Sequence, residues 1–261
     1  MKKIFFALLS LYSFQAYSQD IQKRELDVVR HRKKAVDFFM HDDRNGKLSN
    51  GDVLADENEI FKKKLYKLTA QDPASLTYPF NKLREQEVYI VTSPDKKFRI
   101  YSWDTMTGGT MHFFDNVFQF QSGKKVFSLA PKYLTEQAES GPWYSELYEI
   151  DIADKKAYFG IYHLILSNSQ IFQAVKAFTI ENNKLNDKFE LFNSGSSRLN
   201  EINFEFNFFS VVDRKERPVK LIEYNPKTKI LKIPVVLDDG KVTKRFITYK
   251  FTGRYFEYKR K

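Results

Sequence analysis

Hydrophobic and polar positions follow a helical period in the early part of the chain. Between residues 20 and 68, apolar side chains recur at spacings of three, four and seven, which is typical of amphipathic helices. The positions are Leu26, Val29, Val36, Met40, Phe61, Leu65 and Leu68. Two short helices are therefore expected, and Pro73 and Pro79 end the helical pattern because proline breaks the helix ladder.

After Glu87 the period changes to two, as in β-strands. The expected strands cover residues 88–91, 98–103, 111–120, 125–129, 147–152, 158–166, 172–180, 189–192, 202–209, 219–224, 230–236, 245–251 and 255–258. The alternation is cleanest over 202–209, which indicates a sheet with one face in water. Short turns rich in Asn, Asp, Gly and Pro join the strands and favour antiparallel meanders.

The expected fold is mainly β, with residues 81–261 as one antiparallel domain and residues 19–80 as a helical segment packed on it. The strands fall into three units of four, which start near Val88, Ser145 and Ile202. This spacing fits a small or partial β-propeller. A sandwich or a large meander explains the same strands equally well.

Residues 1–18 have the order of a cleavable signal peptide. Lys2 and Lys3 precede an apolar run over 4–11, and small residues follow at Ala16 and Ser18. The run is shorter than the roughly 20 residues that cross a bilayer, and no later segment has the composition of a membrane span. Because the chain has no cysteine, a lipid anchor at the cleavage site is excluded. We expect a periplasmic or secreted protein.

Charge and cysteine content restrict the chemistry further. The net charge of +10 falls to +8 once Lys2 and Lys3 leave with the signal peptide, and such an excess favours anionic partners. For an exported protein this indicates an anionic glycan or another envelope component, not nucleic acid. Scattered lysines that keep an aromatic-rich protein in solution are the simpler explanation of the charge. The absence of cysteine removes thiol catalysis and thiolate metal sites.

The most unusual stretch of the chain joins two strong predicted strands at residues 102–112. Its candidate ligand-binding residues are Trp103, Asp104, Thr105, Thr107, Gly108, Gly109, Thr110 and His112. The two glycines allow close backbone approach, so a ligand could contact main-chain amides there and stack on Trp103. In the alternative interpretation Asp104 caps a turn and Trp103 belongs to the core.

Signatures of enzymes and metal sites are weak. The four histidines show no metal-ligand spacing, and His163 fits a core position. Asp104 paired with Asp115 or Glu205 would serve a glycosidase only at the correct carboxylate separation. The segment 41–52 resembles a calcium loop but has His41 where an oxygen ligand belongs, so a plain helix connection is the better interpretation. No catalytic residue, metal site or cofactor is predicted.

One stretch carries a resemblance to known proteins. The run Phe98-Arg99-Ile100-Tyr101-Ser102-Trp103-Asp104-Thr105, followed by Thr107-Gly108-Gly109-Thr110-Met111, resembles a hallmark of uncharacterised secreted proteins from Gram-negative bacteria. Residues 175–178 and 217–221 resemble other stretches of the same group. The resemblance implies an exported β-protein and transfers no catalytic residue.

These observations favour a non-catalytic ligand-binding or interaction protein of the envelope. The alternative is a periplasmic hydrolase that acts on envelope glycans or phosphoesters and has its acid chemistry in the 102–112 stretch.

Overall fold

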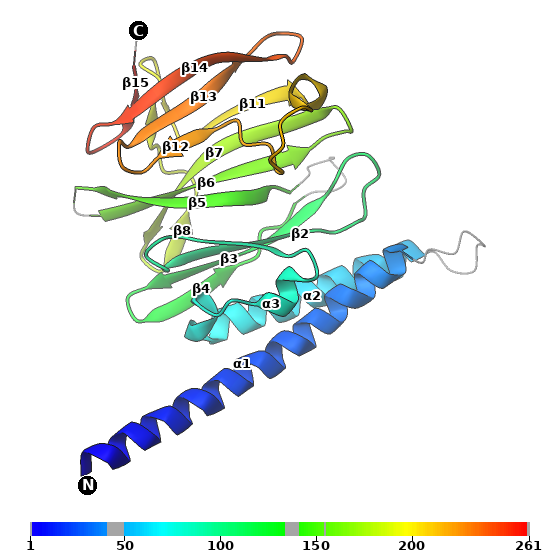
Figure 1. Cartoon of the computed structure of the whole chain (residues 1–261), viewed down its shortest axis with the longest axis vertical. Coiled ribbons are helices and arrows are strands. Elements are labelled where there is room, and N and C mark those ends of the chain that lie inside the picture. Colours follow the sequence, from blue (N-terminus) through cyan, green and yellow to red (C-terminus); the bar gives the residue numbers. More distant parts are fainter. Residues whose placement is uncertain (1, 41–49, 134–140, 154, 260–261) are drawn as a thin grey trace.

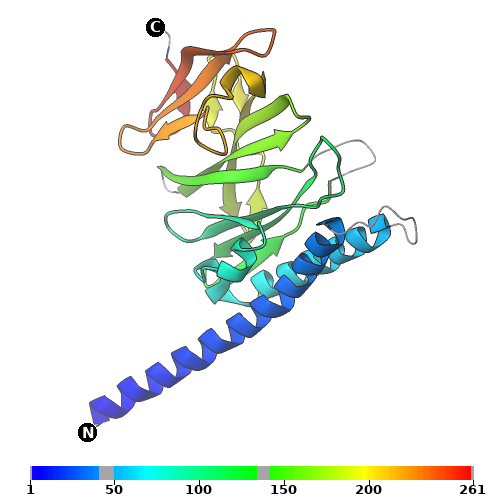
Figure 2. The ribbon, with the colours of Figure 1, turned by 45° about the vertical axis from the view of Figure 1, so that its right-hand side comes forward.

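The computed structural model describes residues 2–40, 50–133, 141–153 and 155–259, with side chains from residue 20 onward in the first helix and from residue 53 in the second. The protein is mainly β, as the sequence predicts, with a helical segment at its N-terminal end (Figure 1). The expected pair of helices is present as α1 (Lys2–Met40) and α2 (Asn50–Gln71), followed by the short helices η1 (Pro73–Leu76) and α3 (Asn81–Arg84). Helix α1 continues through the expected signal peptide, and this first part extends away from the body (Figure 2).

Three sheets follow the helices along the chain. Sheet A has the order β1-β2-β3-β4, sheet B the order β11-β7-β6-β5 with β8 beside β7, and sheet C the order β10-β9-β15-β14-β13-β12. The strands of sheet A are β1 (Tyr89–Thr92), β2 (Phe98–Asp104), β3 (Phe114–Ser122) and β4 (Lys125–Leu129). Those of sheet B are β5 (Trp143–Ile152), β6 (Lys155–Ile165), β7 (Gln170–Glu181), β8 (Lys184–Asn186) and β11 (Glu201–Asn207). Those of sheet C are β9 (Phe192–Asn193), β10 (Arg198–Leu199), β12 (Glu223–Asn225), β13 (Ile230–Val236), β14 (Val242–Phe251) and β15 (Phe256–Tyr258). Pairing is antiparallel throughout the described sheets except between β15 and β9.

The molecule is a stack of layers, with helices, sheet A, sheet B and sheet C in that order (Figure 1). A separate hydrophobic core fills each interface between neighbouring layers. Phe98 of sheet A packs edge-on against Tyr158 and Phe178 of sheet B, at ring-centroid distances of 5.5 and 5.4 Å. Phe159 on the opposite face of sheet B contacts Phe256 of sheet C at 5.4 Å. Sheet B is thus buried on both faces, which explains why β6 and β7 lack clean alternation.

Most strand predictions are confirmed within a few residues, but the division into three equal units is wrong in one place. The strand predicted over 202–209 was assigned to the third unit, whereas β11 pairs with β7 along its whole length and completes sheet B. Residues 208 and 209, which were expected in this strand, belong to the 3-10 helix η3 (Phe208–Val211). Sheet C starts its main hairpins only at Glu223. Within the described residues the three sheets stack and do not form a ring, and the helices cover the outer face of sheet A.

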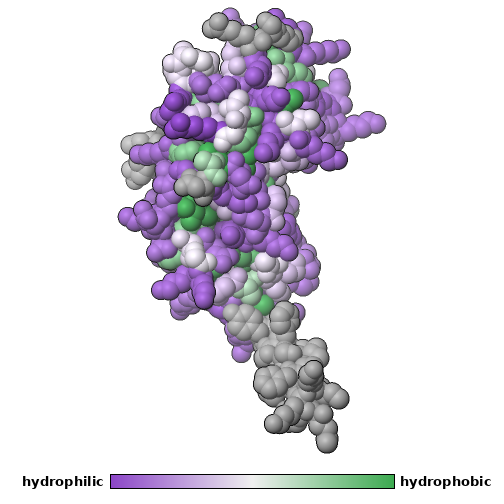
Figure 3. Space-filling view, turned by 90° about the vertical axis from the view of Figure 1, so that its left-hand side faces the viewer, coloured by the Kyte–Doolittle hydropathy of each residue, from purple (hydrophilic) through white to green (hydrophobic). Residues whose placement is uncertain are grey.

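The face of the molecule in Figure 3 is mostly hydrophilic, with small hydrophobic patches between charged side chains. In the part of the chain that the structure describes, no helix is both long and apolar enough to cross a membrane.

Candidate functional site

The predicted stretch at 102–112 spans the end of β2 and the loop to β3. Two contacts close this loop at its base: the Thr105 backbone N–H donates to Phe113 O at 2.8 Å, and Thr105 Oγ1 donates to the same carbonyl at 2.8 Å. The Thr105 hydroxyl also lies 2.8 Å from that of Thr107. Thr107, Gly109 and Thr110 form the exposed outer part.

Trp103 does not belong to a ligand surface. Its side chain is fully buried between the helices and sheet A, and Phe61 of α2 contacts its ring edge-on at 4.8 Å. The prediction that a ligand stacks on Trp103 is therefore wrong, and the alternative that Trp103 is core is correct. In a strand, neighbouring side chains point to opposite faces, so Trp103 lies in the core while Asp104 does not.

Asp104 and His112, eight residues apart, come together in the loop. Asp104 Oδ2 lies 2.6 Å from His112 Nδ1, and Asp104 Oδ1 accepts a hydrogen bond from the Met106 N–H at 2.8 Å. The imidazole is half-exposed, and its Nε2 has no hydrogen-bond partner within the described residues. An oriented carboxylate–imidazole pair of this kind can accept or deliver a proton.

A buried arginine of α1 supports the same loop from below. Arg32 Nη1 donates to the Asp104 carbonyl at 2.8 Å, and Arg32 Nε donates to Gln86 O at 3.1 Å. Burial lowers the pKa of Arg32 to about 10, so the guanidinium remains charged at neutral pH. The helical segment therefore positions the loop.

The two glycines of the loop have different roles. A Cβ on Gly108 would lie 2.0 Å from the carbonyl oxygen of Met111, so only glycine fits where the loop folds back on itself. A Cβ on Gly109 would meet nothing within 4 Å. Gly108 is thus a structural requirement, and Gly109 is free to face a ligand.

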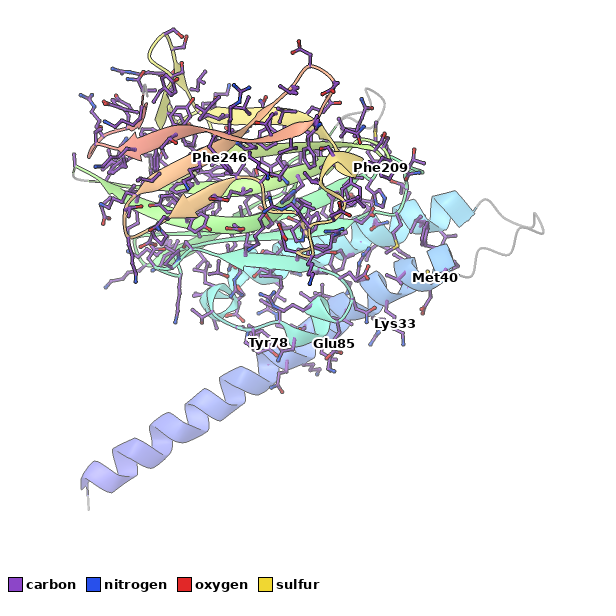
Figure 4. All side chains as sticks on the ribbon, turned by 45° about the horizontal axis from the view of Figure 1, so that its top comes forward. Lys33, Met40, Tyr78, Glu85, Phe209 and Phe246 are labelled. Carbon is purple, nitrogen blue, oxygen red and sulfur yellow. The ribbon has the colours of Figure 1, made fainter. Side chains whose placement is uncertain are left out.

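A concavity lies beside this loop, between α2 and the β3–β4 side of sheet A. It has a volume of about 1440 Å³, and we call it the α2 groove. Its lining includes Thr105, Met106 and Thr107 of the loop, Phe38 and Phe39 at the end of α1, Asn58, Glu59, Lys62, Lys63 and Tyr66 of α2, and Phe113, Asp115, Leu129 and Lys132 on the sheet side. Figure 4 labels Met40 at the end of α1, where this helix runs beside α2.

Several side chains in the α2 groove are large, apolar and exposed. Phe39 is 47%, Leu129 46% and Tyr66 41% exposed, although residues of these types are usually buried. The sequence pattern does not identify these exposed side chains, because an apolar residue beside a helical stripe or at the end of a strand has the same pattern whether it is buried or exposed. In α2 a spacing pattern could have indicated the groove. Asn58, Lys62 and Tyr66 recur every fourth residue and form a row beside the buried Phe61 and Leu65.

Asn58 at the side of the groove has an unpaired acceptor. Its side chain is only 6% exposed, and its Nδ2 donates to Leu54 O at 2.9 Å and to Thr105 O at 2.8 Å. Its Oδ1 is buried without a partner among the described residues. A buried carbonyl without a donor is costly, so this oxygen is a local source of instability beside the groove.

An ion pair fixes the distance between the two sides of the groove. Lys62 Nζ donates to Asp115 Oδ1 at 2.8 Å and to Pro131 O at 2.9 Å. Burial raises the pKa of the Asp115 carboxyl in spite of this ammonium. Lys63 pairs with Glu59 at 3.1 Å, and Lys132 is exposed at the rim and forms no ion pair with another described residue.

Comparison with known proteins gives no indication of function, so the proposal below depends on the geometry of the site. No family model matches this chain, and no curated protein or solved structure matches it either.

The remaining residues considered for catalysis or metal binding lie apart from one another. Asp115 is opposite Trp103 and Asp104 is opposite Phe114, so the two carboxylates leave sheet A on opposite faces and do not flank one substrate. Glu205 lies on β11 of sheet B. Residues 41–49 of the suggested calcium loop fall outside the described residues, and residues 50–52 belong to the first turn of α2. In the part that is described, no group of three His, Asp or Glu side chains is placed to hold a metal ion.

Proposed function

We propose that this chain is an exported, non-catalytic binding protein of the bacterial envelope and that the α2 groove holds an anionic glycan. The observation that carries the proposal is the groove itself, in which exposed aromatic rings lie beside several lysines. Its volume exceeds that of a site for one small molecule, so it suits an extended ligand.

The rings and the acidic groups of a glycan each have a counterpart in the groove. The apolar faces of sugar rings can pack on Tyr66 and Phe39, whose rings are accessible. Carboxylate or sulfate groups can approach Lys132 at the rim, because no acidic side chain among the described residues pairs with its ammonium group.

Two features support export. Among the described side chains of α1, which begin at residue 20, buried Ile21 contacts the body and Arg24 pairs with Asp72 at 3.2 Å. The first part of α1 extends away from the body (Figure 2).

Binding of the mature chain, residues 19–261, to heparin fragments and to neutral dextran fragments tests the function. We expect heparin to bind and dextran to bind much more weakly. Tyr66→Ala should weaken heparin binding by about tenfold, because a lost aromatic stacking contact costs about 1–3 kcal/mol. Lys132→Glu should weaken it and reduce its salt dependence.

Matched controls lie in sheet C. Tyr258 has 40% exposure, close to that of Tyr66, and Lys244 is likewise exposed. Tyr258→Ala and Lys244→Glu should leave binding unchanged. If the sheet C variants lost as much heparin affinity as the groove variants, scattered charge and not the groove would attract the polymer, and the proposal would be wrong.

The Asp104–His112 contact supports a second candidate, a hydrolase of envelope glycans or phosphoesters. Its half-exposed imidazole could act as a general base toward a substrate above the loop. Turnover of such substrates that Asp104→Asn or His112→Ala abolishes would establish this candidate. Binding without turnover, unchanged in both variants, would exclude it.

A further inference from the structure

A second cavity lies between sheets A and B, on the other side of sheet A from the helices. It has a volume of about 620 Å³, which is in the range of sites for single small molecules. Aromatic rings from four strands form its walls: Phe118 of β3, Tyr144 of β5, Tyr162 of β6 and Phe178 of β7. It shares only Leu129 and Tyr133 with the lining of the α2 groove.

The aromatic walls are rigid. Phe118 contacts Tyr144 edge-on at 5.6 Å and Phe178 at 6.0 Å, and Tyr144 contacts Tyr162 at 5.4 Å. A Cβ at position 160 would lie 2.9 Å from Cδ1 of Tyr144, so Gly160 allows this ring to lie directly against β6. Packed rings therefore form the strand side of the cavity, and Pro131, Tyr133 and Pro142 belong to the rest of its lining.

One polar group in these walls has no partner. Tyr144 is only 2% exposed, and no described residue makes a hydrogen bond to its hydroxyl. Burial raises the pKa of this phenol well above its ordinary value, so the hydroxyl keeps its proton and is available as a donor. The other two tyrosines of the cavity are engaged, because Tyr133 donates to Asn116 Oδ1 at 2.6 Å and Tyr162 interacts with Glu201.

The charges at the mouth compensate each other. Lys176 projects from β7 toward sheet A between the buried Ala174 and Phe178, and its Nζ lies 3.2 Å from Asp187 Oδ2. A ligand with a net charge would have to break this pair or leave its own charge without a partner. The cavity thus selects against ions.

We propose that the cavity between sheets A and B is a second ligand site, which takes an uncharged aromatic molecule carrying one carbonyl oxygen. The rings of Phe118, Tyr162 and Phe178 pack against the aromatic body, and the Tyr144 hydroxyl donates to the carbonyl. This site is independent of glycan binding in the α2 groove.

Two naphthalene probes of similar shape test the proposal on the mature chain. 2-Acetylnaphthalene carries the acceptor and 2-ethylnaphthalene does not. We expect the ketone to bind about fivefold more tightly, because one additional hydrogen bond has a net effect of this size on the dissociation constant. Tyr144→Phe removes one oxygen and keeps the ring, so it should abolish the difference while the fold, checked by circular dichroism, is retained.

Control variants separate this site from others. Tyr158→Phe removes a hydroxyl on the same face of sheet B that is bonded to Asp95 at 2.9 Å and does not line the cavity, so it should keep the fivefold preference. Tyr66→Ala in the α2 groove should also keep it, whatever its effect on heparin. Equal or undetectable binding of both probes to the unmodified chain would overturn the proposal, and so would a preference that survives Tyr144→Phe.

Discussion

At the scale of single residues, burial sets the charge state of His163. Its ring is almost completely buried in sheet B, 5.2 Å from the ring of Trp143, and its Nε2 lies 2.8 Å from Ser145 Oγ. Burial lowers the pKa of His163 to about 4, so the imidazole is neutral at physiological pH. His163 is a core histidine, as its apolar sequence context predicts.

Acid should therefore destabilise the protein through His163. The unfolded chain binds a proton near pH 6.5 and the folded chain only near pH 4, so stability falls as the pH falls between these values. We expect a loss of about 2 kcal/mol in the free energy of unfolding between pH 7.5 and pH 5. Urea unfolding at both pH values measures it. His163→Gln, which is always neutral, should remove most of the difference, and an equal pH dependence in this variant would contradict the assignment.

At the scale of elements, polar contacts attach α1 to the body in addition to hydrophobic packing. Glu25 is 2% exposed, and its carboxylate accepts hydrogen bonds from the Tyr78 hydroxyl at 2.9 Å and from the backbone N–H groups of Lys82 and Leu83 at 2.9 and 3.1 Å. These N–H groups belong to the first turn of α3 and have no partner within that helix. Glu25 thus connects α1 to the segment that leads into β1.

Removal of the Glu25 carboxylate should cost far more than removal of an exposed one. Glu25→Ala leaves three donors unpaired in a buried place, and we expect it to lower the free energy of unfolding by about 2–4 kcal/mol. Glu85→Ala is the control, because Glu85 is exposed and pairs only with Lys82 at the surface. We expect this control to stay within about 0.5 kcal/mol of the unmodified chain. Similar effects of the two substitutions in urea unfolding would refute the anchoring role of Glu25.

At the scale of the whole molecule, the layered stack decides which part of α1 the fold requires. Ile21, Val28 and Ala35 are buried against the body, and Arg32 supports the loop after β2. The stack therefore needs the helix from about residue 20 onward, which is also where the expected signal peptide ends.

Removal of residues 1–18 should leave the stack intact. We expect a chain that starts at Gln19 to unfold at the same temperature as the longer chain, and a chain that starts at Lys33 to lose stability or fail to fold. Intact-mass analysis of the protein from the periplasm of an expressing bacterium should find the N-terminus near Gln19. Full-length protein that retains Met1 and stays in the cytosol would contradict export.

Much of the fold was predictable because its signals are local. The helical period over 20–68, the turn before Phe98 and strands such as Ile230–Val236 follow from neighbouring residues alone. The membership of β11 in sheet B was not predictable, because strand pairing across a long connection depends on which sheet offers a free edge. The site was predicted in part: Asp104 and His112 meet, whereas the ring of Trp103 lies in the core.

By itself, the sequence determined the period of each element, the positions of the turns and the abundance of aromatic side chains, since these depend on residues close together in the chain. Only the tertiary structure decided that sheet B is buried on both faces and that exposed apolar side chains of α1, α2 and β4 share one groove. It also decided that Tyr144 lines a cavity in which no described residue bonds its hydroxyl. The physical reason is that burial and hydrogen-bond partnership are properties of the surroundings, which residues distant in the chain provide.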